Sequence, residues 1–336
     1  LNLGMAQLKL GHWRAGWDNY EARWTGSAEA TNGQMARPPS SLPQWDGQGG
    51  TGTQRLLVIT EQGFGDTFQF ARYLALAADR FAKVGFVCSG PTQRLMEWAC
   101  SDRIVFMTRM PSDFDAWDWQ CPLMSLPRAF RTTPETIPAN VPYLTVPAVT
   151  AAHWRERLDL AAPGRLRIGI AWAGRKGHQY DRRRSLAFRQ IAPLLTDDRV
   201  TWVSLQKWTA EEGPPQVPAD VDWLDWTEEL TDFADTAALV AALDLVLSID
   251  SSMVHLGGAL GRPVWMMNRF DAEWRWFRHR ADSPWYPAMR IFNQPAFGDW
   301  DRVIADVRAA LAAVPVPRPP APRRARVATV PAVTPP

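Results

Sequence analysis

The hydrophobic pattern from residue 55 onward alternates between short apolar runs and stretches with helical spacing. Residues 55–60 contain a continuous apolar run, which is typical of a buried parallel strand. Residues 67–81 then place Phe70, Leu74 and Ala77 at helical spacing. The alternation continues with a predicted strand, a helix and a further strand at residues 83–88, 92–99 and 103–108. This order predicts a doubly wound α/β sheet.

A second alternating region follows a proline-rich stretch. That stretch, residues 134–147, interrupts the pattern and marks a domain boundary. Beyond it the sequence predicts strands at 166–172, 200–205, 245–249, 264–267 and 289–292, and helices at 232–243, 253–260 and 300–313. Two regions of this kind predict two facing Rossmann-like domains with a cleft between them.

The first 30 residues predict a helical hairpin. Gly4 lies before Gly11, and Gly16 and Tyr20 follow at helical spacing. The pattern resembles a tetratricopeptide repeat, with a small residue where the two helices touch. One repeat cannot bury its own apolar face, so we expect further repeats upstream of Leu1. A helical hairpin that belongs to no repeat array is the alternative.

These patterns divide the 336 residues into six parts. The last part, residues 314–336, holds eight prolines, four arginines and no acid, so it cannot bury a core and we expect it to be disordered. The expected parts are a helical hairpin at 1–30, a linker at 31–54, an N-terminal Rossmann-like domain at 55–133, an interdomain linker at 134–150, a C-terminal Rossmann-like domain at 151–313 and the Pro/Arg tail at 314–336.

Composition removes several classes of protein. The formal net charge is only +2, so we expect no nucleic-acid partner. The three cysteines form no C-x-x-C pair and cannot close a disulfide framework, which favours a reducing cytoplasm. No apolar run approaches the roughly 18–20 residues that span a bilayer, so we expect no transmembrane segment.

Candidate chemistry lies on the loops after predicted strands, because ligands of open α/β sheets bind beyond the carboxyl ends of the strands. The first such loop, residues 61–66, contains Gly63, Gly65 and Asp66. It is not a nicotinamide dinucleotide fingerprint, because Phe68 stands where the third glycine is needed. Asp66 has two compatible interpretations: a helix N-cap, or a general base that faces the cleft.

The loop after the predicted strand 245–249 carries an anion-binding pattern. Asp250, Ser251 and Ser252 begin a helix, and His255 follows one turn later. Free backbone N–H groups together with two hydroxyls make a ready anion site. A lone histidine is usually a core or capping residue, but this position favours contact with a phosphate or a ribose.

Two further loops bring cations to the same edge of the predicted sheet. Cations there would meet a diphosphate, and a solvated loop is the alternative for the arginines. No Cys/His cluster has metal-ligand spacing, and the Asp-x-Asp motif at 113–115 lies in a loop, so we expect no metal and no other cofactor. The candidate residues of the two loops are Gly174, Arg175, Arg184, Ser185, Gln206 and Lys207.

Together these motifs resemble bacterial family 9 glycosyltransferases, the heptosyltransferase-like enzymes. The resemblance is carried by Glu61-x-Gly-x-Gly-Asp66, by residues 169–174, by Ser204-Leu-Gln206 and by Asp250-Ser-Ser-x-x-His255 with the residues up to Pro263. It looks closest to the branch fused behind tetratricopeptide repeats, to which residues 274–287 are also similar.

The resemblance implies a GT-B fold, with a nucleotide-sugar donor in the C-terminal domain and the acceptor in the N-terminal domain. It implies inverting transfer without a metal, in which Asp66 is the base. Lys207, Asp250, Ser251 and His255 would contact the donor, and Lys207 would stabilise charge on the leaving diphosphate. The repeat-like hairpin, and not the resemblance to the transferases, favours a macromolecular acceptor, a protein or a glycolipid, and upstream repeats would bind a protein partner. We expect a cytoplasmic enzyme, either free or peripheral at the inner face of the membrane.

The main alternative is a catalytically inactive interaction scaffold that still binds nucleotide. A sugar epimerase or phosphorylase on the same fold is a second alternative. Intact Asp66 and Lys207 argue against decay of an active site. Hydrolysis of a nucleotide-sugar would distinguish an enzyme from a scaffold.

The 18 tryptophans are an unusual excess that adds one expectation. Indole rings stack well on sugar and base rings. Trp274, Trp276 and Trp285 follow the Asp250 loop closely, so we expect them to border the donor cleft.

Overall fold

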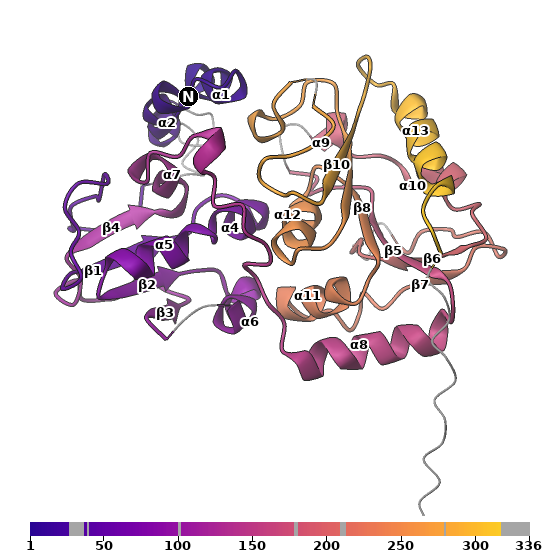
Figure 1. Cartoon of the computed structure of the whole chain (residues 1–336), viewed down its shortest axis with the longest axis horizontal. Coiled ribbons are helices and arrows are strands. Elements are labelled where there is room, and N and C mark those ends of the chain that lie inside the picture. Colours follow the sequence, from indigo (N-terminus) through magenta and orange to yellow (C-terminus); the bar gives the residue numbers. More distant parts are fainter. Residues whose placement is uncertain are drawn as a thin grey trace, which may run out of the picture.

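A computed structural model describes residues 1–26, 37–38, 40–99, 102–177, 181–208, 213–278 and 280–316. Its strands form two separate parallel sheets with helices packed against them (Figure 1), so the predicted mixed α/β architecture with parallel sheets is confirmed. The expected tail lies outside the described residues except for 314–316, and so do residues 31–36 and 39 of the expected linker. Within the described ranges, no helix is long and apolar enough to cross a membrane.

The first sheet has four parallel strands among the described residues, in the order β3-β2-β1-β4. The central strand β1 is apolar and buried from Leu56 to Ile59, as expected of a strand that is covered on both faces. The strands are β1 Arg55–Ile59, β2 Lys83–Val87, β3 Ile104–Met107 and β4 Trp119–Pro122, and the helices among them are α4 Phe64–Phe70, α5 Tyr73–Arg80 and α6 Gly90–Ala99.

Two features of this half differ from the sequence prediction. The single helix expected at 67–81 is wrong: the chain forms α4 and α5, with a turn at Ala71 and Arg72 between them. Helix α4 begins at Phe64 because Gly63 is its N-cap. Strand β4 was not predicted from the sequence, because its four residues include a proline and give no periodic signal.

The second sheet has six parallel strands in the described part of the chain, in the order β10-β9-β8-β5-β6-β7. The five expected strands and three expected helices are present, and α8 begins inside residues 134–150, which were expected to be a linker. The strands are β5 Leu166–Ala171, β6 Val200–Ser204, β7 Trp223–Leu224, β8 Leu245–Ile249, β9 Val264–Asn268 and β10 Met289–Asn293. The helices are α8 Ala148–Ala161, α9 Asp181–Arg184, α10 Phe188–Ile191, α11 Phe233–Ala241, α12 Ser252–Ala259 and α13 Trp300–Ala312.

The N-terminal residues form a helical hairpin. Helices α1 (Asn2–Lys9) and α2 (Trp13–Tyr20) pack against each other, and the 3₁₀ helix η1 (Glu21–Trp24) follows. A Cβ on Gly4 would lie 2.7 Å from the Tyr20 backbone nitrogen, so the helices touch where only glycine fits. The tetratricopeptide interpretation of this hairpin stays a prediction.

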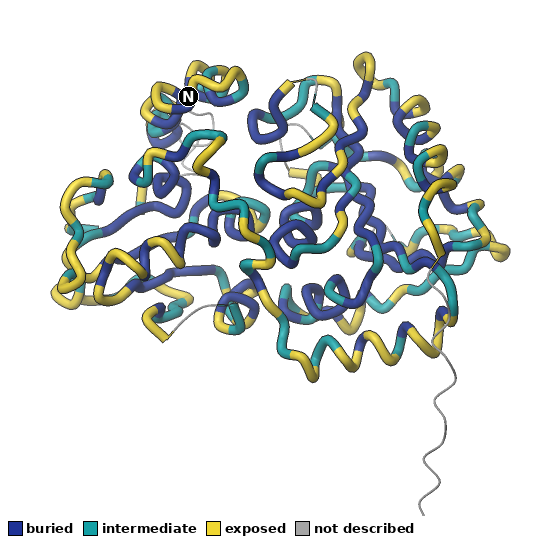
Figure 2. Tube along the Cα trace, viewed as in Figure 1, coloured by how far each residue is buried: buried dark blue, intermediate teal, exposed yellow. Residues whose placement is uncertain are grey.

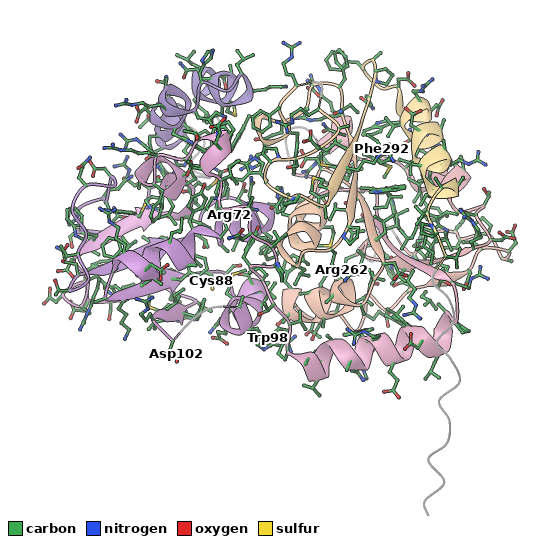
Figure 3. The ribbon with its side chains drawn as sticks, in the orientation of Figure 1. Arg72, Cys88, Trp98, Asp102, Arg262 and Phe292 are labelled. Atoms are coloured by element: carbon green, nitrogen blue, oxygen red, sulfur yellow. The ribbon has the colours of Figure 1, made fainter. Side chains whose placement is uncertain are left out.

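The hairpin and the two sheets share one hydrophobic core. Trp13 from the hairpin, Phe68 from α4 and Trp285 from the second half belong to the same buried cluster, and Figure 2 shows buried chain on both sides of the boundary. Helix α12 packs against α4, and α11 packs against α6. Arg72 lies at this boundary (Figure 3), where its guanidinium donates to the Trp285 carbonyl at 2.9 Å. The two halves are therefore in direct contact.

Candidate functional site

The loop after β1 ends in the first turn of α4, and Asp66 lies in that turn. Gly63 occupies the N-cap position, and its N–H donates to Asp66 Oδ2 at 2.9 Å. The N-cap interpretation of Asp66 is therefore wrong in position, because the carboxylate caps the helix from its third residue. This bond orients the carboxylate and leaves Oδ1 for other partners.

Glu61, at the start of the same loop, has a carboxylate that is bound entirely within the protein. Its carboxylate accepts two hydrogen bonds from Arg23, at 2.7 and 2.8 Å, and a third from the Met124 backbone N–H at 3.1 Å. Glu61 is 9% exposed and Arg23 is fully buried. A bidentate buried pair of this kind fixes the loop to the hairpin.

Asp66 Oδ1 accepts a hydrogen bond from Arg275 Nη2 at 2.5 Å, across the boundary between the halves. Arg275 belongs to the 3₁₀ helix η5 (Trp274–Trp276) and also donates to Glu273. Burial raises the pKa of Glu273 to about 7, although Arg275 opposes the shift, and the Asp250 carboxylate raises it further. Glu273 and Arg275 are not among the residues predicted from the sequence, because segment 274–287 gave only a family resemblance and a cluster of tryptophans.

His255 lies between the two halves rather than on an open surface. Its Nδ1 shares a 2.9 Å hydrogen bond with the Tyr286 hydroxyl, and its ring stacks on Trp276 with centroids 5.3 Å apart. A Cβ on Gly65 would lie only 2.8 Å from His255 Cδ2, so α4 and α12 approach closely here. Burial lowers the pKa of His255 well below its usual range, and the Arg275 and Arg72 charges act in the same direction. This environment therefore disfavours the charged imidazolium form of His255.

Helix α12 begins at the serines where the sequence predicts a helix start, and a serine caps it. Ser251 is the N-cap, and its hydroxyl accepts a hydrogen bond from the Met253 N–H at 3.2 Å. Ser252 is the first residue of the helix, and a Cβ added to Gly65 would lie 3.5 Å from the Ser252 Cα. The helix start therefore faces the turn that carries Asp66.

The loops after β5 and β8 meet at the same edge of the second sheet. The Gly174 N–H donates to Ser185 Oγ at 2.9 Å. Arg184 lies directly against Gly174, and its Nη1 donates to the Asp250 carbonyl at 3.0 Å. These four predicted residues are thus brought together, whereas Arg175 is exposed on the turn beside them.

The two predicted site residues in the loop after β6 have different partners in the structure. Gln206 Oε1 accepts from the Ala173 N–H at 2.9 Å, so this side chain joins the ends of β5 and β6. Lys207 is exposed, and its Nζ donates to the Leu230 carbonyl. Of the two, Lys207 is the more exposed residue.

The three tryptophans of segment 274–285 are buried, and two of them contact His255 and Arg275. Trp276 stacks on His255, and the Arg275 guanidinium lies 4.4 Å from the Trp274 ring centroid. Trp285 stacks on Trp13 of the hairpin at 5.6 Å. Exposure of the three rings is 3% or less, so they pack the boundary instead of presenting open faces.

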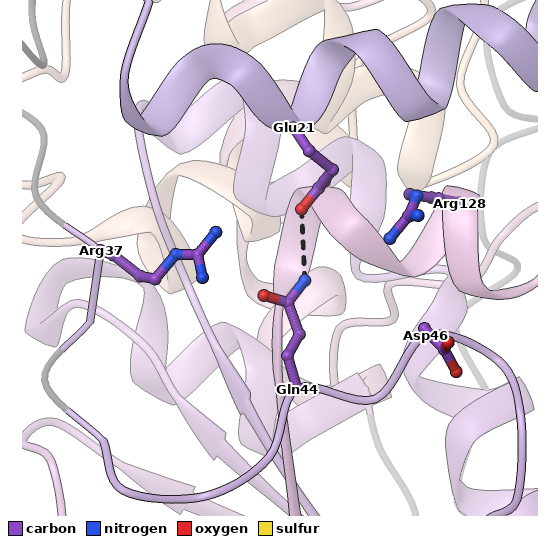
Figure 4. A pocket seen from close by; sticks show the side chains of 5 residues that line it. All are labelled: Glu21, Arg37, Gln44, Asp46 and Arg128. Atoms are coloured by element: carbon purple, nitrogen blue, oxygen red, sulfur yellow. Dashed lines mark hydrogen bonds between the residues drawn. The ribbon is translucent and has the colours of Figure 1, made fainter.

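Two surface hollows lie beside the hairpin. One, of about 290 Å³, is lined by Glu21, Arg37, Gln44, Asp46 and Arg128 (Figure 4). The other, of about 480 Å³, is lined by residues 11–15 and 133–135. Neither contains a predicted site residue. Among the described residues, no group of three or more His, Cys, Asp or Glu side chains could hold a metal ion.

Comparison of the sequence with known proteins finds one long match. No family model matches the chain. The FlbA protein of Caulobacter vibrioides is 27% identical over 327 residues, which are 90% of this chain and 53% of FlbA. The chain therefore spans about half the length of that relative.

Solved structures share the fold described above. A family 9 glycosyltransferase from Veillonella parvula matches with a TM-score of 0.50 and 10% identity, over 75% of this chain and 91% of that protein. The ADP-heptose LPS heptosyltransferase II of E. coli matches with a TM-score of 0.52 and 14% identity, over 77% of this chain and 98% of that protein. The parallel sheets of this chain thus match those of GT-B-type glycosyltransferases at the level of the fold.

Proposed function

We propose that this chain is a glycosyltransferase that moves a sugar from a nucleotide-sugar to a hydroxyl group, with inversion and without a metal ion. The likeness of its fold to a family 9 glycosyltransferase and a heptosyltransferase supports the proposal. The observation that carries it is the contact of Asp66, beyond the carboxyl end of β1, with Arg275 of the other half, while the adjacent Gly65 lies against the start of α12. A base on one half would then face a donor held by the other half.

The donor diphosphate would lie at the carboxyl ends of β5, β6 and β8. The backbone N–H groups that begin α12 attract an anion, and the Ser251 and Ser252 hydroxyls lie beside them. Lys207 and Arg175 are exposed cations on the neighbouring loops. Fixed donors aimed at a developing negative charge typically contribute about 3–4 kcal/mol each to transition-state stabilisation.

Asp66 would act as the general base. It would take the proton of the acceptor hydroxyl while that oxygen forms its bond to the anomeric carbon. The bond from that carbon to the diphosphate breaks on the opposite face, so the anomeric configuration inverts. The diphosphate leaves with the electron pair, and Lys207 and the α12 helix start stabilise its charge.

We also propose a macromolecular acceptor, either a protein or a glycolipid, and a cytoplasmic location at the inner membrane face. Cys88 and Cys121 are free, buried thiols, which supports a reducing compartment. The resemblance of the hairpin to a tetratricopeptide repeat supports a protein partner bound by further repeats.

A thermal-shift screen of ADP, GDP, UDP, CDP and their sugar derivatives tests the donor site. A nucleotide that binds the native state raises the melting temperature, and we expect at least one to do so. Lys207→Met should weaken that nucleotide about tenfold, because one charge-assisted contact is lost. Lys83→Met is the matched control, since Lys83 is exposed at the start of β2.

Two outcomes would count against the proposal. A screen in which no nucleotide raises the melting temperature would contradict it. Nucleotide binding without any release of sugar would favour the inactive scaffold instead.

A further inference from the structure

We infer that Arg275 is a positioning residue that reaches from the second half of the molecule and holds the Asp66 carboxylate in its working orientation. The inference rests on the proposed function and assigns a role to a residue outside the predicted site. Each nitrogen of the guanidinium has an acceptor. Nε donates to Gln69 Oε1 at 2.6 Å, Nη1 to Glu273 Oε1 at 2.5 Å and Nη2 to Asp66 Oδ1 at 2.5 Å.

Arg275 is itself held on several sides. Glu273 Oε2 accepts from the Arg275 backbone N–H at 2.9 Å, so one carboxylate binds both the main chain and the side chain. The Trp274 ring lies 4.4 Å from the guanidinium carbon. Arg275 is only 7% exposed, and its planar fork matches these acceptors in a way that a lysine ammonium cannot.

Asp66 keeps room for a substrate hydroxyl in this arrangement. Gly63 N–H occupies one lone pair of Oδ2, and Arg275 occupies one lone pair of Oδ1. A carboxylate oxygen has a second lone pair, and 18% of the Asp66 side chain is exposed. The two N–H donors therefore fix the plane of the carboxylate and leave one lone pair on each oxygen for a substrate hydroxyl.

The contact also joins the halves, because Asp66 lies in α4 and Arg275 lies in η5. The base is in place only when segment 273–276 is docked against α4. A misplacement of about 1 Å at a reacting group lowers a rate by about 10²-fold, so loss of Arg275 should slow turnover more than it weakens donor binding.

A second ion pair between the halves supplies a control. Arg94 of α6 pairs with Asp232 at 2.6 Å and with Asp235 at 2.5 Å, at the start of α11. Its side chain is 44% exposed, and none of these three residues belongs to the proposed site. Arg94→Met removes an ion pair between the halves without touching Asp66.

The test compares Arg275→Met, Arg275→Lys and Arg94→Met in a steady-state assay that follows nucleoside diphosphate release from the nucleotide-sugar found in the screen. We expect kcat to fall about 10²-fold in Arg275→Met while the donor KM changes less than threefold. Arg275→Lys keeps the charge and lets the chain fold if the methionine variant does not, and its kcat should fall at least tenfold. Arg94→Met should stay within twofold of wild type.

Three results would overturn the inference while the proposed function stands: a wild-type kcat in Arg275→Met or Arg275→Lys, a higher donor KM at unchanged kcat, or equal losses of kcat in Arg94→Met and Arg275→Met. A wild-type protein that releases no nucleoside diphosphate from any nucleotide-sugar would overturn the proposed function, and this inference with it.

Discussion

Glu61 and Asp66 show at the residue scale how burial gives two acids of one loop different roles. Glu61 is 9% exposed and pairs with the buried Arg23. A buried charge is tolerated only with a partner, so this acid serves the attachment of the hairpin. Asp66 is more exposed, and its two N–H partners leave lone pairs free. Of the two acids, Asp66 is therefore the one that we propose as the base.

Glu61→Gln should destabilise the fold by about 3 kcal/mol, because it leaves the Arg23 guanidinium buried with Glu21 as its remaining acidic partner. Chemical denaturation followed by tryptophan fluorescence measures the loss. Asp79→Asn is the control, since Asp79 also pairs with an arginine but its side chain is 73% exposed. That exposed pair should contribute less than about 1 kcal/mol. Equal losses in the two variants would contradict the structural role of Glu61.

The sequence predicts the candidate site in part. Asp66, Ser251 and His255 could be located because each follows a recognisable strand end. Arg275 could not be paired with Asp66, because 209 positions separate them and no local periodicity connects them. The roles of the predicted residues remain predictions.

At the scale of elements, the N-terminal hairpin contacts both halves of the molecule. Trp13 stacks on Phe277 and Trp285, with ring centroids 5.9 and 5.6 Å away. Trp17 Nε1 donates to the Thr132 carbonyl of the first half at 3.0 Å. Lys9 Nζ donates to the Ala272 carbonyl at 2.5 Å, beside the segment that carries Arg275. The hairpin thus supports segment 272–277.

Trp13→Ala should destabilise the protein by about 3–5 kcal/mol, because a large buried ring is lost from a packed core. It should also speed amide hydrogen exchange in residues 272–277, since Phe277 and Trp285 lose the ring on which both stack. Leu3→Ala on the same hairpin is the control, because Leu3 is 62% exposed. Unchanged exchange in 272–277 would show that the hairpin does not hold that segment.

Elements differ in how well the sequence predicts them. Residues 56–59 of β1 and all five residues of β8 are buried, and Ser248 is the one polar residue among them, so their pattern is clear. β7 has only two residues. α8 buries only Trp154 and Leu158 over its 14 residues, so its apolar stripe is too narrow to predict a helix.

For the whole molecule, the candidate site depends on the meeting of three parts. α4 of the first half carries Asp66, and the second half supplies α12 and Arg275. The hairpin is attached to the first half through Arg23 and to the second through Trp13. Neither sheet alone holds the proposed base together with the proposed donor site, so activity should require the docked arrangement.

The most direct test of the proposed chemistry is the rate of nucleoside diphosphate release from the bound nucleotide-sugar in Asp66→Asn. We predict a rate 10²–10⁴-fold below wild type, as for the loss of a general base. The nucleoside diphosphate should raise the melting temperature as much as in wild type, and Asp79→Asn should keep the wild-type rate. An Asp66→Asn variant that turns over at the wild-type rate would contradict the assignment of Asp66 as the base.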